Sequence, residues 1–206
     1  MKAGEPGTRM GRLTAMLCLA AWISCGAAWG ADADWPCVQP KMAELTPAQM
    51  WAGPPLEDAG DWRDDAAVAA LVPKLVARRT SLEDAAAAIE RFAESAGPDK
   101  DKRLTRLFAG VFERINAERS RVVAGIERYA RKQKALADRI RQEEAALRAK
   151  PGATADRTAQ DLETQLRWDT RIYEERLQAL AYVCESPVIL EQRAFALARE
   201  IQNHLE

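Results

Sequence analysis

The sequence predicts an all-α fold, an elongated antiparallel helical hairpin of coiled-coil type with shorter N-terminal helices packed at its base. Three observations lead to this prediction. Apolar residues recur at steps of three and four from Leu104 to Leu147, a spacing that places side chains on one face of a helix. A Pro151-Gly152 pair interrupts the pattern, which resumes at Leu162 and continues to the C-terminus. Two long helices joined by a short turn should fold back on one another.

Length and composition limit the possible functions. The chain has 206 residues, 48% of them apolar, which is enough for a hydrophobic core in one domain. Its 30 basic and 31 acidic side chains leave no positive surplus, so we expect no nucleic-acid partner. His204 is the one histidine in the sequence, and there is no Gly-x-Ser-x-Gly turn or glycine-rich phosphate loop. We therefore expect no catalytic residues, no cofactor and no metal site.

Residues 1–30 have the three-part layout of a secretory signal peptide. A basic beginning is followed by an uncharged stretch from residue 13 to residue 30, and small side chains stand at Ala28 and Gly30. We predict cleavage after Gly30, with a cut after Ala33 as the second choice. The basic residues are Lys2, Arg9 and Arg12.

Two alternatives to cleavage stay open. The uncharged stretch is about long enough to remain as a membrane anchor, although it is rich in Ala, Gly, Ser and Cys. A lipoprotein cut before Cys25 would need a Leu-like residue where Trp22 stands. With residues 1–30 removed, 27 basic and 30 acidic side chains remain, and we expect a periplasmic or secreted protein without a membrane span.

Signal-peptide removal would leave two cysteines, Cys37 and Cys184. In an oxidising compartment these two allow one intramolecular pairing, so we predict a structural disulfide between them. The alternative is a redox-active thiol, but Trp35-Pro36-Cys37 lacks the second cysteine of a Cys-x-x-Cys motif.

Residues 31–60 are predicted to form an irregular segment with one short helix, because five prolines fall within them. The helix should begin at Thr46-Pro47-Ala48-Gln49, where Thr46 can cap and Gln49 can reach back. Leu45 to Gln49 resembles the Leu-Thr-x-x-Gln motif of small helical periplasmic chaperones of the Spy and CpxP kind. That resemblance covers five residues and implies a chaperone function.

Residues 61–98 are predicted to form two short amphipathic helices. The first runs from Asp61 to Arg79, and Pro73 within it should kink or divide it. Ser81 caps the second, in which Leu82 belongs to the apolar face, and Gly97-Pro98 ends it.

Residues 99–206 are predicted to form the long hairpin, turning at residues 151–152. Polar residues interrupt the apolar seam of the first long helix at Glu118 and Gln133. The apolar pattern of the second restarts at Ser186-Pro187. Counting equally from the turn places Cys184 near Arg121. Two single glycines, Gly110 and Gly125, either allow close helix approach or are simply tolerated.

Aromatic residues are the candidate partner surface. Three tryptophans lie within 28 residues of one another near the N-terminus, and a fourth lies in the second long helix. Their rings either anchor the irregular segment on the bundle or form an aromatic surface for a protein partner. The candidate residues are Trp35, Trp51, Trp62, Trp168, Tyr129 and Tyr173.

We therefore predict an exported, non-enzymatic helical interaction or assembly protein of the bacterial-type periplasm. Its partner would be another protein or a second copy, bound through the hairpin. The alternative is an ATP-independent holdase chaperone, which the tentacle-like hairpin also favours through its similarity to periplasmic holdases such as Skp. A third hypothesis, an enzyme that uses arginine and carboxylate side chains, would require a deep pocket lined by both.

Overall fold

The computed structural model describes residues 34–149 and 157–206, and these residues form an all-helical structure. The predicted signal peptide, Cys18, Cys25 and the predicted turn at residues 151–152 lie outside the described residues. The four α-helices are α1 (Ala66–Val76), α2 (Leu82–Glu94), α3 (Lys100–Arg148) and α4 (Arg157–Gln202). Four short 3-10 turns precede or join them: η1 (Pro47–Gln49), η2 (Leu56–Asp58), η3 (Trp62–Asp64) and η4 (Gly97–Asp99). The predicted fold class is confirmed.

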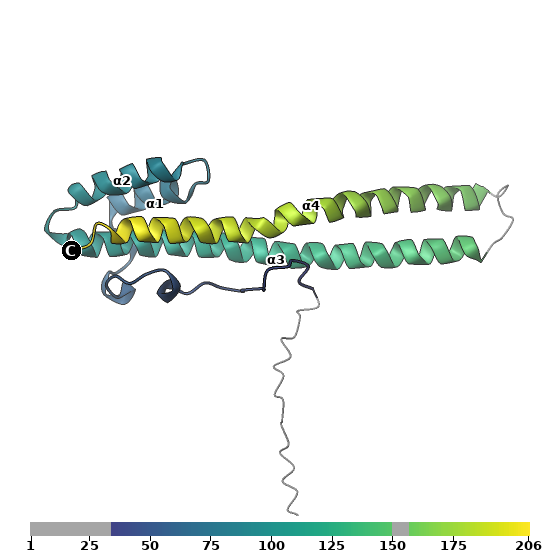
Figure 1. The fold of residues 1–206 in the computed structure, drawn as a ribbon, viewed down its shortest axis with the longest axis horizontal. Helices are drawn as coiled ribbons and strands as arrows, with labels where there is room; N and C mark the ends of the chain where they lie inside the picture. The colour runs from purple at the N-terminus through teal and green to yellow at the C-terminus, as the bar shows by residue number, and fades with distance from the viewer. Residues whose placement is uncertain (1–33, 150–156) are drawn as a thin grey trace, which may run out of the picture. The chain divides into compact units, whose positions relative to one another are not determined.

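The two long helices, α3 and α4, lie side by side and run in opposite directions (Figure 1). α3 has 49 residues and is therefore about 73 Å long at a rise of 1.5 Å per residue. Polar contacts between the helices show which residues lie opposite one another. Along these contacts the residue number falls in α4 as it rises in α3, as expected for antiparallel helices. The contacts join Arg119 to Glu191, Tyr129 to the Arg176 carbonyl and Gln133 to the Tyr173 carbonyl.

Shorter elements pack against one end of this hairpin. α1 contacts α3 and α2 contacts α4, while the segment before α1 runs along α3 (Figure 1). Ion pairs from Asp34 reach Arg131 and Lys134 of α3. We call residues 135–148 of α3 and 157–172 of α4 the arm, and the remaining described residues the base.

Side-chain caps fix where α1 and α2 begin. Asp65 accepts hydrogen bonds from the Ala67 and Val68 N–H groups at 3.0 and 3.2 Å, so α1 begins at Ala66 rather than at Asp61 as predicted. Ser81 accepts from Asp84 N–H at 3.0 Å and starts α2. Leu82, the first residue of α2, is exposed and not part of the apolar face. Gly97 ends the turn after α2 with φ of 70°, a conformation that favours glycine.

Both helix-interior prolines are accommodated without a break. α1 continues through Pro73, and α4 continues through Pro187, so neither the division of α1 nor the restart at Ser186-Pro187 is found. A proline lacks the N–H that would bond to the carbonyl four residues earlier. In α4 this loss is offset by packing, because Pro187 and Leu190 are both buried.

The hydrophobic core lies in the base, where α1, α2, α3 and α4 meet. Phe108 is fully buried and stacks on Trp51, with ring centroids 4.2 Å apart and planes 4° from parallel. Aliphatic side chains from all four helices pack around Phe108 in the same core, and Trp51 is partly buried against it. The fully buried ones include Val68, Val72, Leu75, Ile89, Leu104, Leu107, Val111, Leu197, Ala198 and Ile201.

The seam of α3 differs from the predicted seam by one position. Arg119 is 3% exposed, whereas Glu118 is exposed to solvent. The buried positions include Val111, Ile115, Arg119, Val123 and Ile126, so the consecutive steps of four lie between Val111 and Val123 rather than between Glu118 and Ile126 as predicted. Gln133 is buried in the seam as predicted.

The two glycines of α3 have different surroundings. A Cβ atom built on Gly110 would lie 2.7 Å from Val72 Cγ2 and 2.8 Å from the ring of Trp62. On Gly125, the nearest neighbour would be the end of the flexible Arg128 side chain at 3.8 Å. Gly110 therefore permits close approach of α1 and η3, and Gly125 is simply tolerated.

We expect Gly110→Ala to lower the free energy of unfolding by about 1–3 kcal/mol, because Val72 and Trp62 must shift to admit the methyl group. The matched control is Gly125→Ala, which should raise it by up to about 1 kcal/mol through helix propensity. Urea denaturation followed by circular dichroism measures both. Equal effects of the two substitutions would contradict this account of Gly110.

The segment between residues 41 and 60 forms few helical hydrogen bonds, so side chains of α3 and α4 satisfy its backbone. Arg119 donates to the Met42 carbonyl at 2.7 Å, and Arg106 donates to the Ala59 carbonyl at 2.5 Å. Gln202 both donates to the Met50 carbonyl and accepts from Ala52 N–H. The irregular segment is thus held at a fixed position along the hairpin.

The predicted disulfide between Cys37 and Cys184 is present. Its Cα atoms are 5.6 Å apart, and it joins positions separated by 147 residues. Cys184 lies on α4, so the bridge fixes the start of the irregular segment to the hairpin. A disulfide of this kind indicates an oxidising compartment.

Candidate interaction surface

The three N-terminal tryptophans are half-buried, and each indole N–H has an acceptor. Trp35 donates to the Gln39 carbonyl at 2.6 Å, Trp51 to the Pro54 carbonyl at 2.8 Å and Trp62 to Glu113 at 2.9 Å. Trp51 also stacks on Phe108 of the core. Trp51 and Trp62 therefore anchor the segment before α1 on α3, whereas the indole N–H of Trp35 bonds within that segment.

The tyrosines of the candidate surface lie along the hairpin. Tyr129 is half-buried and donates its hydroxyl proton to the Arg176 carbonyl at 2.8 Å. Tyr173 is also half-buried, and its carbonyl accepts from Gln133. Both residues therefore take part in the contact between α3 and α4.

Trp168 has a different environment from the other three tryptophans. Its side chain is 58% exposed, and the guanidinium of Arg171 lies 6.0 Å from its ring centroid. Arg171 in turn donates to Glu175 at 2.8 Å. Trp168 is therefore an apolar ring on the surface of the arm, next to a cation and a carboxylate.

Trp168 belongs to a row of exposed apolar side chains on α4. Tyr182, which is 77% exposed, and Ile189 follow it at spacings of fourteen and seven residues. Multiples of seven keep side chains on one side of a helix that lies in a two-helix supercoil. We call Trp168, Tyr182 and Ile189 the α4 stripe.

Sequence reasoning did not select Tyr182 or Ile189 as surface residues. Their seven-residue spacing from Trp168 was the available signal, but the same residues also fit the helical apolar pattern. Burial separates the two cases, because the seam of α4 is formed by other residues. The buried seam residues include Asp169, Cys184, Pro187, Leu190, Ala194 and Leu197.

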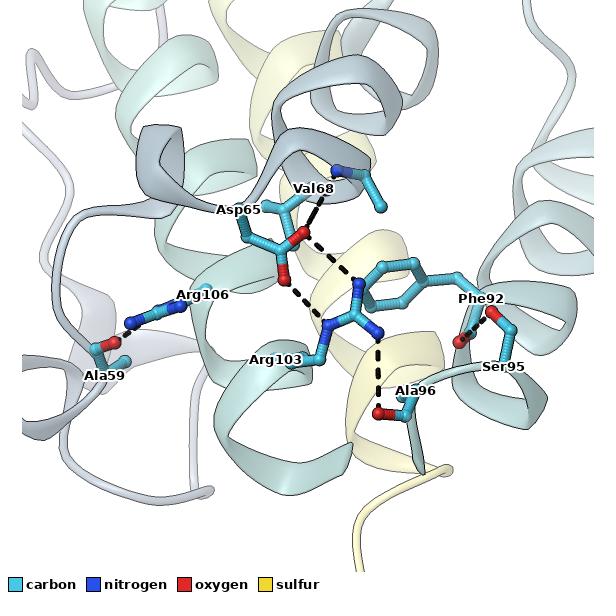
Figure 2. A network of polar contacts seen from close by, with 9 residues as sticks. Ala59, Asp65, Val68, Phe92, Ser95, Ala96, Arg103 and Arg106 are labelled. Atoms are coloured by element: carbon cyan, nitrogen blue, oxygen red, sulfur yellow. Dashed lines mark hydrogen bonds and ion pairs between the residues drawn. The ribbon is translucent and has the colours of Figure 1, made fainter. Parts of the chain in front are cut away.

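A polar network joins the ends of three helices in the base. Arg103 of α3 donates to both oxygens of Asp65 at 2.7 and 3.2 Å and to the Ala96 carbonyl at 3.4 Å, and its guanidinium lies over Phe92 (Figure 2). Hydrogen bonds from Arg103 hold the pKa of Asp65 below its usual 3.8. This interaction therefore stabilises the base above that pH and is lost as the pH falls through the lowered pKa.

Two further arginines are used inside the base. Arg119 bonds to Glu191 at 2.6 Å, and Arg193 donates to the Leu75 carbonyl at the end of α1. Burial lowers the pKa of Arg193. Both side chains donate hydrogen bonds to backbone carbonyls, and Arg119 also pairs with a carboxylate, so both have a structural role.

One hollow is lined by both arginine and carboxylate side chains, as the enzymatic hypothesis requires. It lies between the C-terminal end of α1, the middle of α3 and α4. Its lining includes Arg78, Arg114, Glu118 and Arg121 above Val76, Ile115 and Leu190. All four charged residues are exposed, and Glu118 pairs with Arg121 at 3.1 Å.

Across residues 34–149 and 157–206, no group of three or more His, Cys, Asp or Glu side chains is placed to hold a metal ion. His204 lies 3.2 Å from Glu200, one turn earlier in the chain.

Comparison with known proteins gave no relative: no family model, no curated protein and no solved structure matches this chain. None of the described helices is both long and apolar enough to cross a bilayer.

Proposed function

We propose that this protein is an exported, non-enzymatic interaction or assembly module of the bacterial-type periplasm, and that its protein partner contacts the α4 stripe. The observation that supports this proposal is the exposure of Trp168, Tyr182 and Ile189 on one side of α4. Tryptophan and tyrosine are the residues most often found at the energetic centre of protein interfaces. The disulfide agrees with export to an oxidising compartment.

The helical frame supports this proposal in a second way. α3 and α4 are held together by the side chains of their own seam, and the exposed α4 stripe is not part of that seam. A rigid surface loses little conformational entropy when a partner binds. A partner can therefore bind the α4 stripe without disrupting contacts of the core or of the seam.

A photocrosslinking experiment in cells that export the protein tests the proposal. Benzoylphenylalanine is placed at Tyr182, or in a matched control at Gln142, which is exposed on α3. We expect an adduct of defined mass from position 182 and none from position 142. Trp168→Ala should reduce the adduct roughly tenfold, whereas Leu177→Ala, an exposed apolar control outside the stripe, should not. Equal adducts from positions 182 and 142 would contradict the proposal.

A holdase chaperone is the second candidate function, because exposed apolar side chains also bind unfolded chains. It predicts that the purified protein prevents aggregation of an unrelated unfolding protein without ATP. Light scattering at a several-fold molar excess measures this effect. Undiminished aggregation would remove the holdase candidate and leave the assembly module, which requires a defined partner instead.

A further inference from the structure

The arm contains two carboxyl groups buried in the seam between its helices. Glu143 of α3 is 9% exposed and Asp169 of α4 is 2% exposed. Leu136 of α3 and Ala159 of α4 are also buried in the arm. Ionised carboxylates are rarely buried to this degree unless each has a cationic partner.

One arginine serves both carboxyl groups. Arg139 Nε lies 2.5 Å from Asp169 Oδ2, but 3.9 Å from the nearest oxygen of Glu143. Neither Glu143 Oε2 nor Asp169 Oδ2 has a hydrogen-bond partner in the described part of the chain, although Asp169 Oδ2 has this ion pair. Arg139 therefore neutralises Asp169, and a second negative charge on Glu143 would be buried without a cation in contact.

The charged groups that act on Glu143 come from both helices of the arm. They are Asp169 on α4, which disfavours its ionisation, and Arg139 on α3, which favours it. Burial raises the pKa of Glu143 above its usual 4.5, and the charge of Asp169 adds to this effect. Arg139 acts in the opposite direction but does not offset the two together.

We propose that Glu143 and Asp169 form a proton-binding site that tightens the arm as the pH falls. One proton from solvent binds the Glu143 carboxylate and forms an O–H bond. The acid then donates that hydrogen to the Asp169 carboxylate, which keeps its ion pair with Arg139. Before protonation, Arg139 neutralises one of the two carboxylates and the other charge stays in the seam. After protonation no net charge remains there, and the protonated Glu143 carboxyl group can donate a hydrogen bond. This inference goes beyond the proposed function and does not depend on it.

A fall in pH should change the stability of the arm and of the base in opposite directions. For Glu143, whose pKa is raised on folding, the stabilisation is complete below pH 4.5 and is lost as the pH rises through the raised value. For Asp65 of the base, whose pKa is lowered, the stabilisation is present above pH 3.8. As the pH rises above 4.5 the arm should therefore lose stability while the Asp65 interaction of the base is kept.

Hydrogen–deuterium exchange of the full mature chain, corrected for intrinsic exchange rates, tests the proposal. We expect amides of the arm to exchange at least about threefold more slowly at pH 5 than at pH 7.5, with unchanged protection around Phe108. In Glu143→Gln the arm should exchange slowly at both pH values. In Asp169→Asn the pH response should be smaller than in the wild type, because the charge of Asp169 no longer opposes ionisation of Glu143 while burial still does.

Glu144→Gln is the matched control, since Glu144 is exposed and pairs with Arg148 on the outside of the same turn. It should keep the full response. A wild-type arm that exchanges equally at both pH values, or that is unprotected at both, would overturn the proposal. An Asp169→Asn arm that responds as the wild type would show that no proton is shared. Circular dichroism establishes that each variant is folded.

Discussion

Replacing Cys37 and Cys184 together by alanine is expected to lower the free energy of unfolding by about 5 kcal/mol. The disulfide joins positions 147 residues apart, and in the chain-entropy model so long a loop greatly restricts the unfolded chain. Urea denaturation of the purified protein, with and without reductant, measures the change. Reductant should lower the stability of the wild type and leave that of the variant unchanged.

A second measurement tests whether the bridge also holds the residues around Cys37 in place in the folded protein, apart from its effect on the entropy of the unfolded chain. The bridge ties residue 37 to α4, while ion pairs of Asp34 and Lys41 hold neighbouring residues to α3. Without the bridge, the Leu45 amide, which donates to Asn116 of α3 at 3.1 Å, should lose protection, whereas the amides around Phe108 should keep theirs. A variant as stable as the oxidised wild type would show that the chain-entropy account does not apply to this bridge.

Phe108→Ala is expected to lower the free energy of unfolding by about 3–5 kcal/mol, the usual cost of removing a fully buried phenyl ring. The ring stacks on Trp51 at 4.2 Å, so the cavity would open directly beside that indole. Thermal and urea denaturation measure the loss. Tryptophan fluorescence of the native state should shift to longer wavelength as Trp51 gains contact with water.

Phe112→Ala is the matched control for this core prediction. Phe112 is one turn further along α3, 5.9 Å from Phe108 between centroids, but it is only partly buried. Its loss should cost clearly less, because less apolar surface is removed from contact with protein. An equal loss of unfolding free energy in Phe108→Ala and Phe112→Ala would contradict the central position of Phe108 in the core.

Much of the helical framework could be predicted because its signals are local. Steps of three and four define the faces of α3 and α4, Ser81 caps α2, and Gly97 ends the turn that follows it. Helix formation and capping depend on residues within one or two turns, which are adjacent in the sequence. The disulfide was predictable for another reason: if residues 1–30 are removed as predicted, only one pairing of cysteines is possible.

The candidate surface was predictable only in part. Trp168 was selected for its aromatic ring, as was Trp51, yet one is exposed on the arm and the other stacks in the core. Residue type alone does not separate these two environments. Tyr182 and Ile189 became candidates only when the seam of α4 was known.

The sequence by itself therefore determined the helices, their antiparallel pairing and the cysteine pair, because periodicity, caps and cysteine number are properties of the chain. The tertiary structure decided which of two neighbouring residues is buried, as with Arg119 and Glu118. It also decided which glycine is crowded and that Glu143 meets Asp169 across the seam. A helical period defines a face to within about one residue, whereas burial and charge pairing depend on segments that meet only after folding.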